Sequence, residues 1–187
     1  MSDPQNELAL KRNGLTISKR EDVAVTHVAL RRGKRADLEA RASAVLGVSL
    51  PFTPRVVESS GKMVVWAGPE QWLVIEPRSA GRDPSVELAE AFKGAASIVD
   101  VGDSRVIFRV EGPKATEVLA PSMAIDFHDQ VFKPGDVAIT HASHLGAMVW
   151  RLPNGSGYDF ACARTYAVAF SEWLAYACGK SVVFALI

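Results

Sequence analysis

The order of predicted elements, which occurs twice along the chain, places the strongest constraint on the fold. Alternating apolar residues and helical spacings predict strand, helix, strand, strand, helix, strand over residues 23–101 and again over residues 102–187. Val64–Trp66 precedes the turn of the first hairpin, and Met148–Trp150 precedes that of the second. We therefore predict an α+β protein of two similar halves, each an antiparallel or mixed sheet with helices packed on one face. Residues 1–22 are polar with weak periodicity and are expected to form an N-terminal tail that is disordered or docks elsewhere.

The first helix is predicted over residues 35–46. Leu38, Ala42 and Val45 are spaced so that they share one face, and Gly47 is a typical residue to end the helix. Between this helix and the first hairpin, the sequence from Pro51 to Pro54 predicts a loop.

Three further helices are predicted, and the shortest of them begins at Gly112-Pro113 and carries Ala115, Val118 and Leu119. Asp83 followed by Pro84 is an N-cap and first-turn pair for a helix that runs to about Lys93. The clearest apolar stripe predicts a helix from Tyr166 to Cys178, and a last strand follows from Val182 to Leu186.

The composition excludes several classes of protein. The 187 residues are 48% hydrophobic, and 21 Lys and Arg balance 21 Asp and Glu, which argues against a nucleic-acid binder and favours association with a partner. We see neither a secretory signal nor an apolar run of the roughly 20 residues that span a bilayer. Cys162 and Cys178 have no metal-binding spacing and are expected to be reduced and buried, which points to the cytoplasm.

The histidines offer two candidate sites. His141 and His144 could form a metal pair, but residues three apart on a strand point to opposite faces, and no third ligand is nearby. His128 lies between Asp126 and Asp129, as in a catalytic His–Asp pair, but no nucleophile accompanies it. Unrelated histidines and an Asx-capped loop are the favoured interpretations.

Charged residues near strand ends offer two more candidate sites. Asp100, Asp103 and Arg105 could be an acid–base set, although an Arg–carboxylate clamp that holds the turn is favoured. Arg151 and Arg164, near the ends of adjacent predicted strands, could bind an anionic group, but solvent-exposed strand ends are the favoured interpretation.

The tryptophans could stack on a pterin or flavin ring, but core or subunit-interface anchors are the favoured interpretation. The four residues are Trp66, Trp72, Trp150 and Trp173.

Two segments carry a resemblance to a known family. They are Gly68-Pro-Glu-Gln-Trp-Leu73 and Val99-Asp-Val-Gly-Asp-Ser-Arg105. Together with the motifs that follow, they resemble the gamma subunit family of heterotetrameric sarcosine oxidases, over nearly everything after about Val25. The further motifs are Gly112–Ala115, Ala124–His128, Phe132–Gly135, Thr140, Leu145 and Trp150–Arg151.

The resemblance implies a complex that demethylates sarcosine oxidatively to glycine and passes the one-carbon unit to tetrahydrofolate. In that family the alpha subunit carries the NAD and folate sites, the beta subunit carries FAD and shares a covalent FMN with alpha, and the delta subunit holds zinc. The gamma subunit has no established cofactor. Its fold is similar to the folate-binding domain of aminomethyltransferases. Val99–Leu119 resembles the Asp-Val-Ser…Gly…Leu segment of those domains. The acidic pair of those enzymes is missing from Ser143–Gly146.

We therefore expect a non-catalytic structural subunit with no catalytic, cofactor-binding or metal-binding residues of its own. The implied partners are the alpha, beta and delta subunits, with neither nucleic acid nor membrane, and the isolated chain could self-associate. The alternatives are a free-standing one-carbon folate-binding protein of the aminomethyltransferase-like group and an orphan interaction module.

Overall fold

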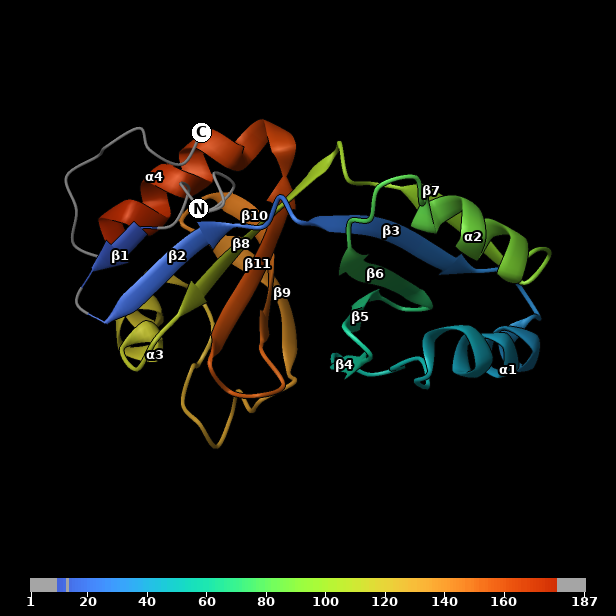
Figure 1. Ribbon diagram of the computed structural model, residues 1–187. Helices are drawn as coiled ribbons and strands as arrows, with labels where there is room; N and C mark the ends of the chain where they lie inside the picture. The colour runs from blue at the N-terminus through green and yellow to red at the C-terminus, as the bar shows by residue number, and fades with distance from the viewer. Residues whose placement is uncertain (1–9, 13, 178–187) are drawn as a thin grey trace. The chain divides into compact units, whose positions relative to one another are not determined.

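The structure, a computed structural model, describes residues 10–12 and 14–177, which form two compact units (Figure 1). The Trp72 unit comprises Asp22–Asp103 together with Gly135–Val137, and the Trp150 unit comprises the described residues up to Glu21, Ser104–Pro134 and those from Ala138 onward. Each unit is built on one sheet whose recorded strand pairs are antiparallel. The predicted α+β class is confirmed.

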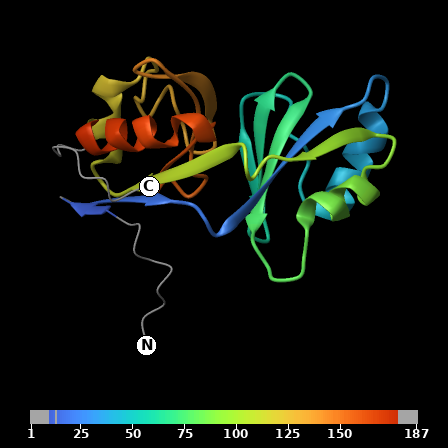
Figure 2. The same cartoon turned by 90° about the horizontal axis from the view of Figure 1, so that it is seen from above.

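The Trp72 unit has a five-stranded sheet in the order β4-β5-β6-β3-β7. The helices α1 and α2 lie on the same side of this sheet (Figure 2). The strands are β3 (Val23–Leu30), β4 (Val56–Ser59), β5 (Lys62–Gly68), β6 (Gln71–Pro77) and β7 (Ala96–Asp100), and the helices are α1 (Arg35–Leu46) and α2 (Pro84–Ala91).

Helix α1 has the predicted bounds, and Gly47 ends it in the left-handed conformation that glycine adopts without strain. Its buried residues are Leu38, Ala42 and Leu46, four apart, so the face is turned by one residue from the predicted one. Val45, which we predicted to face the core, is 38% exposed. Leu38 packs with Trp72 of β6 in one apolar cluster.

Helix α2 begins as predicted, because the Asp83 side chain accepts from the backbone N–H groups of Ser85 and Val86. The helix ends at Ala91, two residues before the predicted end. Strand β4 was not predicted. It pairs with β5 through a turn at Ser60 and Gly61, both with positive φ, and its four residues are too few to show a period.

The Trp150 unit has a six-stranded sheet in the order β1-β2-β8-β11-β10-β9. Its core combines β8 and β11 with α4, since Phe108, Phe160 and Phe170 pack together, with Phe108 stacked on Phe170. The strands are β1 (Leu10–Arg12), β2 (Leu15–Lys19), β8 (Arg105–Glu111), β9 (Val137–Ala142), β10 (Leu145–Arg151) and β11 (Gly157–Ala163), and the helices are α3 (Ala115–Leu119), η2 (Ala120–Ser122), η3 (Arg164–Tyr166) and α4 (Ala167–Ala177).

The predicted N-terminal tail differs from the structure. Leu15–Lys19 form β2, which pairs with β8, and Leu15 and Ile17 are buried in the core. Two apolar residues in a five-residue strand give little periodicity, and the partner strand is distant in sequence. The second predicted boundary, 101/102, lies two residues before the boundary between the units at Asp103.

Two further predictions concern the C-terminal part. The helix expected from Tyr166 appears as η3 followed by α4, which is described as far as Ala177. Cys178 and the strand predicted over Val182–Leu186 lie outside the described residues. Within the described part of the chain, no helix combines the length and apolar character needed to cross a bilayer.

Candidate functional site

The Trp150 unit contains a pocket of about 590 Å³ that brings together residues from separate sequence predictions. It lies where the loop after η2 meets the end of β10 and the start of β11. Arg151 comes from the end of β10, His128 and Asp129 from the loop, Thr116 from α3 and Tyr158 from β11. Arg151 and the His128 loop are unrelated candidates in the sequence, and the fold places them on one pocket.

Arg151 is the main charged group of the pocket. Its Nη1 atom donates to Asp129 Oδ1 at 2.6 Å and to the carbonyl of Phe132 at 2.9 Å. The guanidinium carbon lies 5.9 Å from the centroid of the Tyr158 ring, within cation–π range. The Arg151 side chain is only 13% exposed. The arginine therefore ties the loop to the sheet, while Nε and Nη2 donate to no other described residue.

The His128 loop is held by Asx-type bonds. Asp126 Oδ1 accepts from the backbone N–H of His128 at 2.8 Å, so the favoured loop-capping interpretation is confirmed. His128 Nδ1 accepts from the backbone N–H of Gln130 at 3.2 Å. A neutral imidazole then carries its proton on Nε2. Because Asp126 is used by the backbone and Asp129 by Arg151, neither carboxylate orients the imidazole as a catalytic pair requires.

Hydroxyl groups on the other walls of the pocket are also hydrogen-bonded within the unit. Thr116 Oγ1 and Tyr158 Oη are 2.7 Å apart, and Ser156 Oγ donates to Glu111 Oε1 at 2.7 Å. Gly157 permits this close packing, since a Cβ there would lie 2.1 Å from the carbonyl oxygen of Val110. The pocket can accept a small anionic group at the free side of Arg151, but it presents no activated nucleophile.

Arg164 does not join Arg151. In the antiparallel register Arg151 lies opposite Tyr158, whereas Arg105 lies opposite Ala163, the residue before Arg164. Six residues along β11 separate the two places by about 20 Å. The two arginines therefore form no shared anion site, because adjacent antiparallel strands end at opposite edges of the sheet. The favoured interpretation, an exposed strand end, holds for Arg164 but not for Arg151, whose side chain is 13% exposed.

The remaining charged candidates are scattered. His141 and His144 are both exposed at the turn between β9 and β10, and the described residues contain no group of three or more potential metal ligands. Asp100 Oδ1 accepts from the N–H of Gly102 at 2.8 Å, so it holds its own turn. Asp103 ends the Trp72 unit and Arg105 lies in the other unit, so the predicted clamp between them stays a prediction.

The tryptophans are mainly core residues. Trp72 is fully buried, donates from Nε1 to the carbonyl of Pro51 at 2.6 Å, and meets Phe52 edge-on. Trp150 is also fully buried, and its Nε1 has no hydrogen-bond partner among the described residues. Trp173 packs against Phe170 with ring centroids 5.1 Å apart. Core anchoring is confirmed for Trp72 and Trp150, whereas Trp66 is half-buried.

A buried ion pair was not predicted from the sequence. Asp159 on β11 is 0% exposed and accepts bidentate bonds from Arg109 of β8, at 2.7 Å from Nε and 2.8 Å from Nη2. Burial raises the pKa of Asp159, while the Arg109 guanidinium acts in the opposite direction. The available signal was an aspartate in an otherwise apolar strand, opposite an arginine that points inward. To recognise the pair, one must know the register between the two strands. Cys162, three residues further along β11, is also buried. It is a free thiol, and burial raises its pKa to about 11.

The sequence of this chain is similar to those of known proteins. The chain matches the family described as sarcosine oxidase, gamma subunit family, over residues 32–180. The sarcosine oxidase subunit gamma of an Arthrobacter species is 29% identical over 142 residues, covering 74% of this chain and 69% of that protein. The subunit of Corynebacterium sp. strain P-1 is 28% identical over 146 residues, covering 76% and 71%.

Solved structures have the same fold. A chain of the heterotetrameric sarcosine oxidase from Corynebacterium sp. U-96, in complex with pyrrole 2-carboxylate, is similar with a TM-score of 0.76 and 20% identity, covering 95% of this chain and 92% of that one. Aminomethyltransferase T of the glycine cleavage system from Bartonella henselae has a TM-score of 0.61 and 14% identity, covering 88% and 46%.

The two sheets with their helices place the chain in an α+β class whose fold is also found in that aminomethyltransferase. Within this class, the chain belongs to the sarcosine oxidase gamma subunit family.

Proposed function

We propose that this chain is the gamma subunit of a heterotetrameric sarcosine oxidase and that its role is structural. The observation that carries the proposal is the family match over residues 32–180, which runs through both units. Its partners would be the alpha, beta and delta subunits. The complex would demethylate sarcosine oxidatively to glycine, pass the one-carbon unit to tetrahydrofolate, and hold FAD, FMN and NAD in the other subunits.

The chemistry of the candidate pocket supports a structural role. Asp129 and the Phe132 carbonyl hold Arg151, Gln130 occupies Nδ1 of His128, and Thr116 pairs with Tyr158. General acid–base or nucleophilic catalysis needs a group poised toward the substrate and oriented by a neighbour. Here the hydrogen bonds fix the loop to the sheet.

The outer face of α4 supports association with a partner. The helix carries a single charged residue, Glu172, and its exposed side includes Val168 at 42% and Tyr176 at 78% exposure. A helix that is apolar on its solvent side as well as its core side is characteristic of a buried element. Aromatic residues are enriched at the centres of subunit interfaces.

Co-expression tests the proposal. The alpha, beta and delta chains are purified with and without this chain, and size exclusion and sarcosine-dependent peroxide release are measured. We expect this chain to co-elute with the complex, and its omission to lower the yield of assembled, active complex. Full activity and stability of the three remaining chains alone would contradict the structural role.

Paired variants locate the surface. Val168→Glu with Tyr176→Glu places two charges on α4, and we expect loss of co-elution with an unchanged melting temperature of the isolated chain. Val86→Glu is the matched control, at an apolar residue of α2 whose 60% exposure lies between those of Val168 and Tyr176, and it should assemble normally.

A free-standing one-carbon folate-binding protein is the second candidate. The similarity to an aminomethyltransferase over 88% of this chain favours it, and the open side of Arg151 could pair with a carboxylate. The turn Ser143–Gly146 lacks the carboxylates expected there. Titration of the purified chain with tetrahydrofolate, followed by Trp fluorescence, separates the two: saturable binding that is lost in Arg151→Gln would favour the folate protein.

A further inference from the structure

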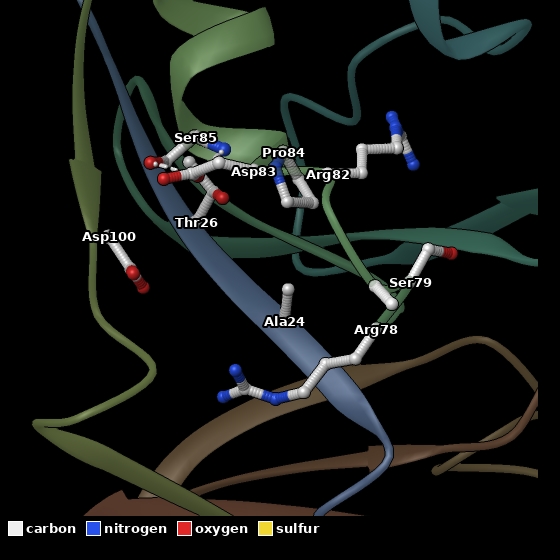
Figure 3. Close-up of a pocket in the computed structure, with 10 residues that line it drawn as sticks. Ala24, Thr26, Arg78, Ser79, Arg82, Asp83, Pro84, Ser85 and Asp100 are labelled. Carbon is white, nitrogen blue, oxygen red and sulfur yellow. Dashed lines mark hydrogen bonds between the residues drawn. The ribbon is translucent and has the colours of Figure 1, made fainter.

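A second pocket, which we call the Arg78 pocket, lies within the Trp72 unit. Its volume is about 360 Å³, and it is formed by the first half of β3, the loop after β6, the start of α2 and the end of β7. Figure 3 shows Arg78 crossing beneath Ala24 and Asp100 projecting from β7 toward the same space. Ala24, Ala80 and Pro84 are small side chains that leave the space open.

Arg78 supplies a positive charge on one side. Its guanidinium makes neither a hydrogen bond nor an ion pair with any residue that the structure describes. Nη2 lies 3.1 Å from the position that a Cβ on Gly102 would take, and Asp100 Oδ1 lies 3.2 Å from the same position. The absence of a side chain at Gly102 therefore lets the arginine and the carboxylate approach one end of the pocket without pairing.

Two carboxylates supply negative charge on the other walls. Asp83 Oδ1 accepts from the N–H and the hydroxyl of Ser85 at 2.9 and 2.7 Å, and Asp100 Oδ1 accepts from the N–H of Gly102. These bonds use one oxygen of each group, and the Oδ2 atoms accept none from the described residues. The bonds from Ser85 also lower the pKa of Asp83, which keeps its carboxylate ionised at neutral pH.

Thr26 adds a hydroxyl group to the lining of the pocket. The residue is 2% exposed and lines the pocket beneath the start of α2. Its hydroxyl can donate one hydrogen bond to a bound molecule and can also accept one. In Figure 3 this side chain lies between those of Asp83 and Asp100.

We propose that the Arg78 pocket binds a small zwitterion of the α-amino acid class. Its carboxylate pairs with Arg78, and its ammonium group donates to the Oδ2 atoms of Asp83 and Asp100. An anion alone would meet two carboxylates, and a cation alone would meet the guanidinium, so a ligand that carries both charges matches the pocket. The Thr26 hydroxyl supplies a further hydrogen bond. This site is separate from the pocket around Arg151 and does not depend on the proposed structural role.

Titration of the isotope-labelled full chain by NMR tests the site, with glycine as the probe. We expect saturable shifts of the amide signals of Ser79, Ser85 and Gly102. Acetate and methylammonium each carry half of the charges, and trimethylglycine has no N–H donor, so all three should bind at least roughly tenfold more weakly, because each loses a charge-assisted hydrogen bond. Acetate that binds as tightly as glycine would show a simple anion site and overturn the proposal.

Variants complete the test. Arg78→Gln and Asp100→Asn should each weaken glycine binding at least roughly tenfold, and Asn at position 100 retains the acceptor for the Gly102 N–H. Arg32→Gln, at an exposed arginine of the same unit outside the pocket, is the control and should bind as the unaltered chain does. Melting curves verify that each variant is folded. Glycine affinity unchanged in Arg78→Gln, or absence of glycine binding to the unaltered chain at millimolar concentration, overturns the proposal.

Discussion

The two units satisfy their buried polar groups in opposite ways. In the Trp150 unit the buried acid Asp159 has both oxygens bonded to Arg109, while the indole N–H of Trp150 has no partner among the described residues. In the Trp72 unit the indole N–H of Trp72 is bonded to Pro51, while the buried acid Glu76 has only Oε2 bonded, to Arg82 at 2.8 Å. The two units thus hydrogen-bond different kinds of buried side chain. Equivalent substitutions in the two units should therefore lower the free energy of unfolding by different amounts.

The largest effect is expected from Trp72→Ala. It removes a fully buried indole from the cluster with Leu38 and Phe92 and frees the Pro51 carbonyl. We expect a loss of about 3–5 kcal/mol in the free energy of unfolding, measured by chemical denaturation. Trp66→Ala, at the half-buried residue opposite Trp72 in the hairpin, is the control and should cost much less. A melting temperature unchanged by Trp72→Ala would contradict the assigned anchor role.

The second effect contrasts the two buried acids. Asp159→Asn turns an acceptor facing Arg109 into a donor, so one of the two bonds is lost and the negative charge beside a largely buried guanidinium is removed. We expect a cost of about 3 kcal/mol. Glu76→Gln keeps an acceptor for Arg82, whose side chain is partly exposed, and should cost about 1 kcal/mol or less.

Urea denaturation at neutral pH measures both costs. A stability of Glu76→Gln below that of Asp159→Asn would reverse the ranking and show that complete pairing of the carboxylate is not what sets the cost.

The third effect contrasts the two indoles. Phe in place of Trp removes the N–H in both cases. Trp72→Phe leaves the Pro51 carbonyl unpaired and should cost more than Trp150→Phe, which removes a donor that had no partner. The difference is expected to be about 1 kcal/mol, the net value of one hydrogen bond, since the lost volume is the same. Equal costs would indicate that Trp150 Nε1 is hydrogen-bonded in solution.

The smallest effect concerns reactivity. Burial raises the pKa of Cys162 to about 11, so the thiolate, which is the reactive form, is scarce at neutral pH. Alkylation with iodoacetamide, followed at the Cys162 peptide by mass spectrometry, should be very slow at pH 7 in the folded chain and should accelerate as the pH rises toward 11. In urea the same peptide should react rapidly. Rapid alkylation of the folded chain at pH 7 would show that this strand opens frequently.

Patterns between residues close in the sequence predicted the helices and most strands. They could not predict which residues pair across neighbouring strands. The spacing of Leu38 and Ala42 and the glycine at position 47 predicted α1, and Asp83 with Pro84 predicted the start of α2, since capping depends on neighbours in sequence. The bond between Arg109 and Asp159 depends on the register of two strands 50 residues apart.

The candidate pocket shows the same limit. Asp126 and His128 were recognised as an Asx-capped loop because the bond spans two residues. Their position beside Arg151 arises only when the loop folds back against the end of β10. The candidate anion site of Arg151 and Arg164 fails for a different reason: β10 and β11 form an antiparallel hairpin, so the end of β10 lies beside the start of β11 and not beside its end.

The placement of β2 has a consequence for how the chain is made on the ribosome. Ser18 is synthesised early but pairs with Arg109, and the whole segment Asp22–Asp103 emerges between them. Domains tend to fold as units in the order of synthesis. The five strands of the Trp72 unit can therefore pair first. The apolar side chains of Leu15 and Ile17 stay exposed to solvent until β8 has been synthesised. A nascent chain in which β7 has left the ribosome and β8 has not should thus present a folded unit preceded by an exposed apolar segment, which is a natural point for chaperone binding.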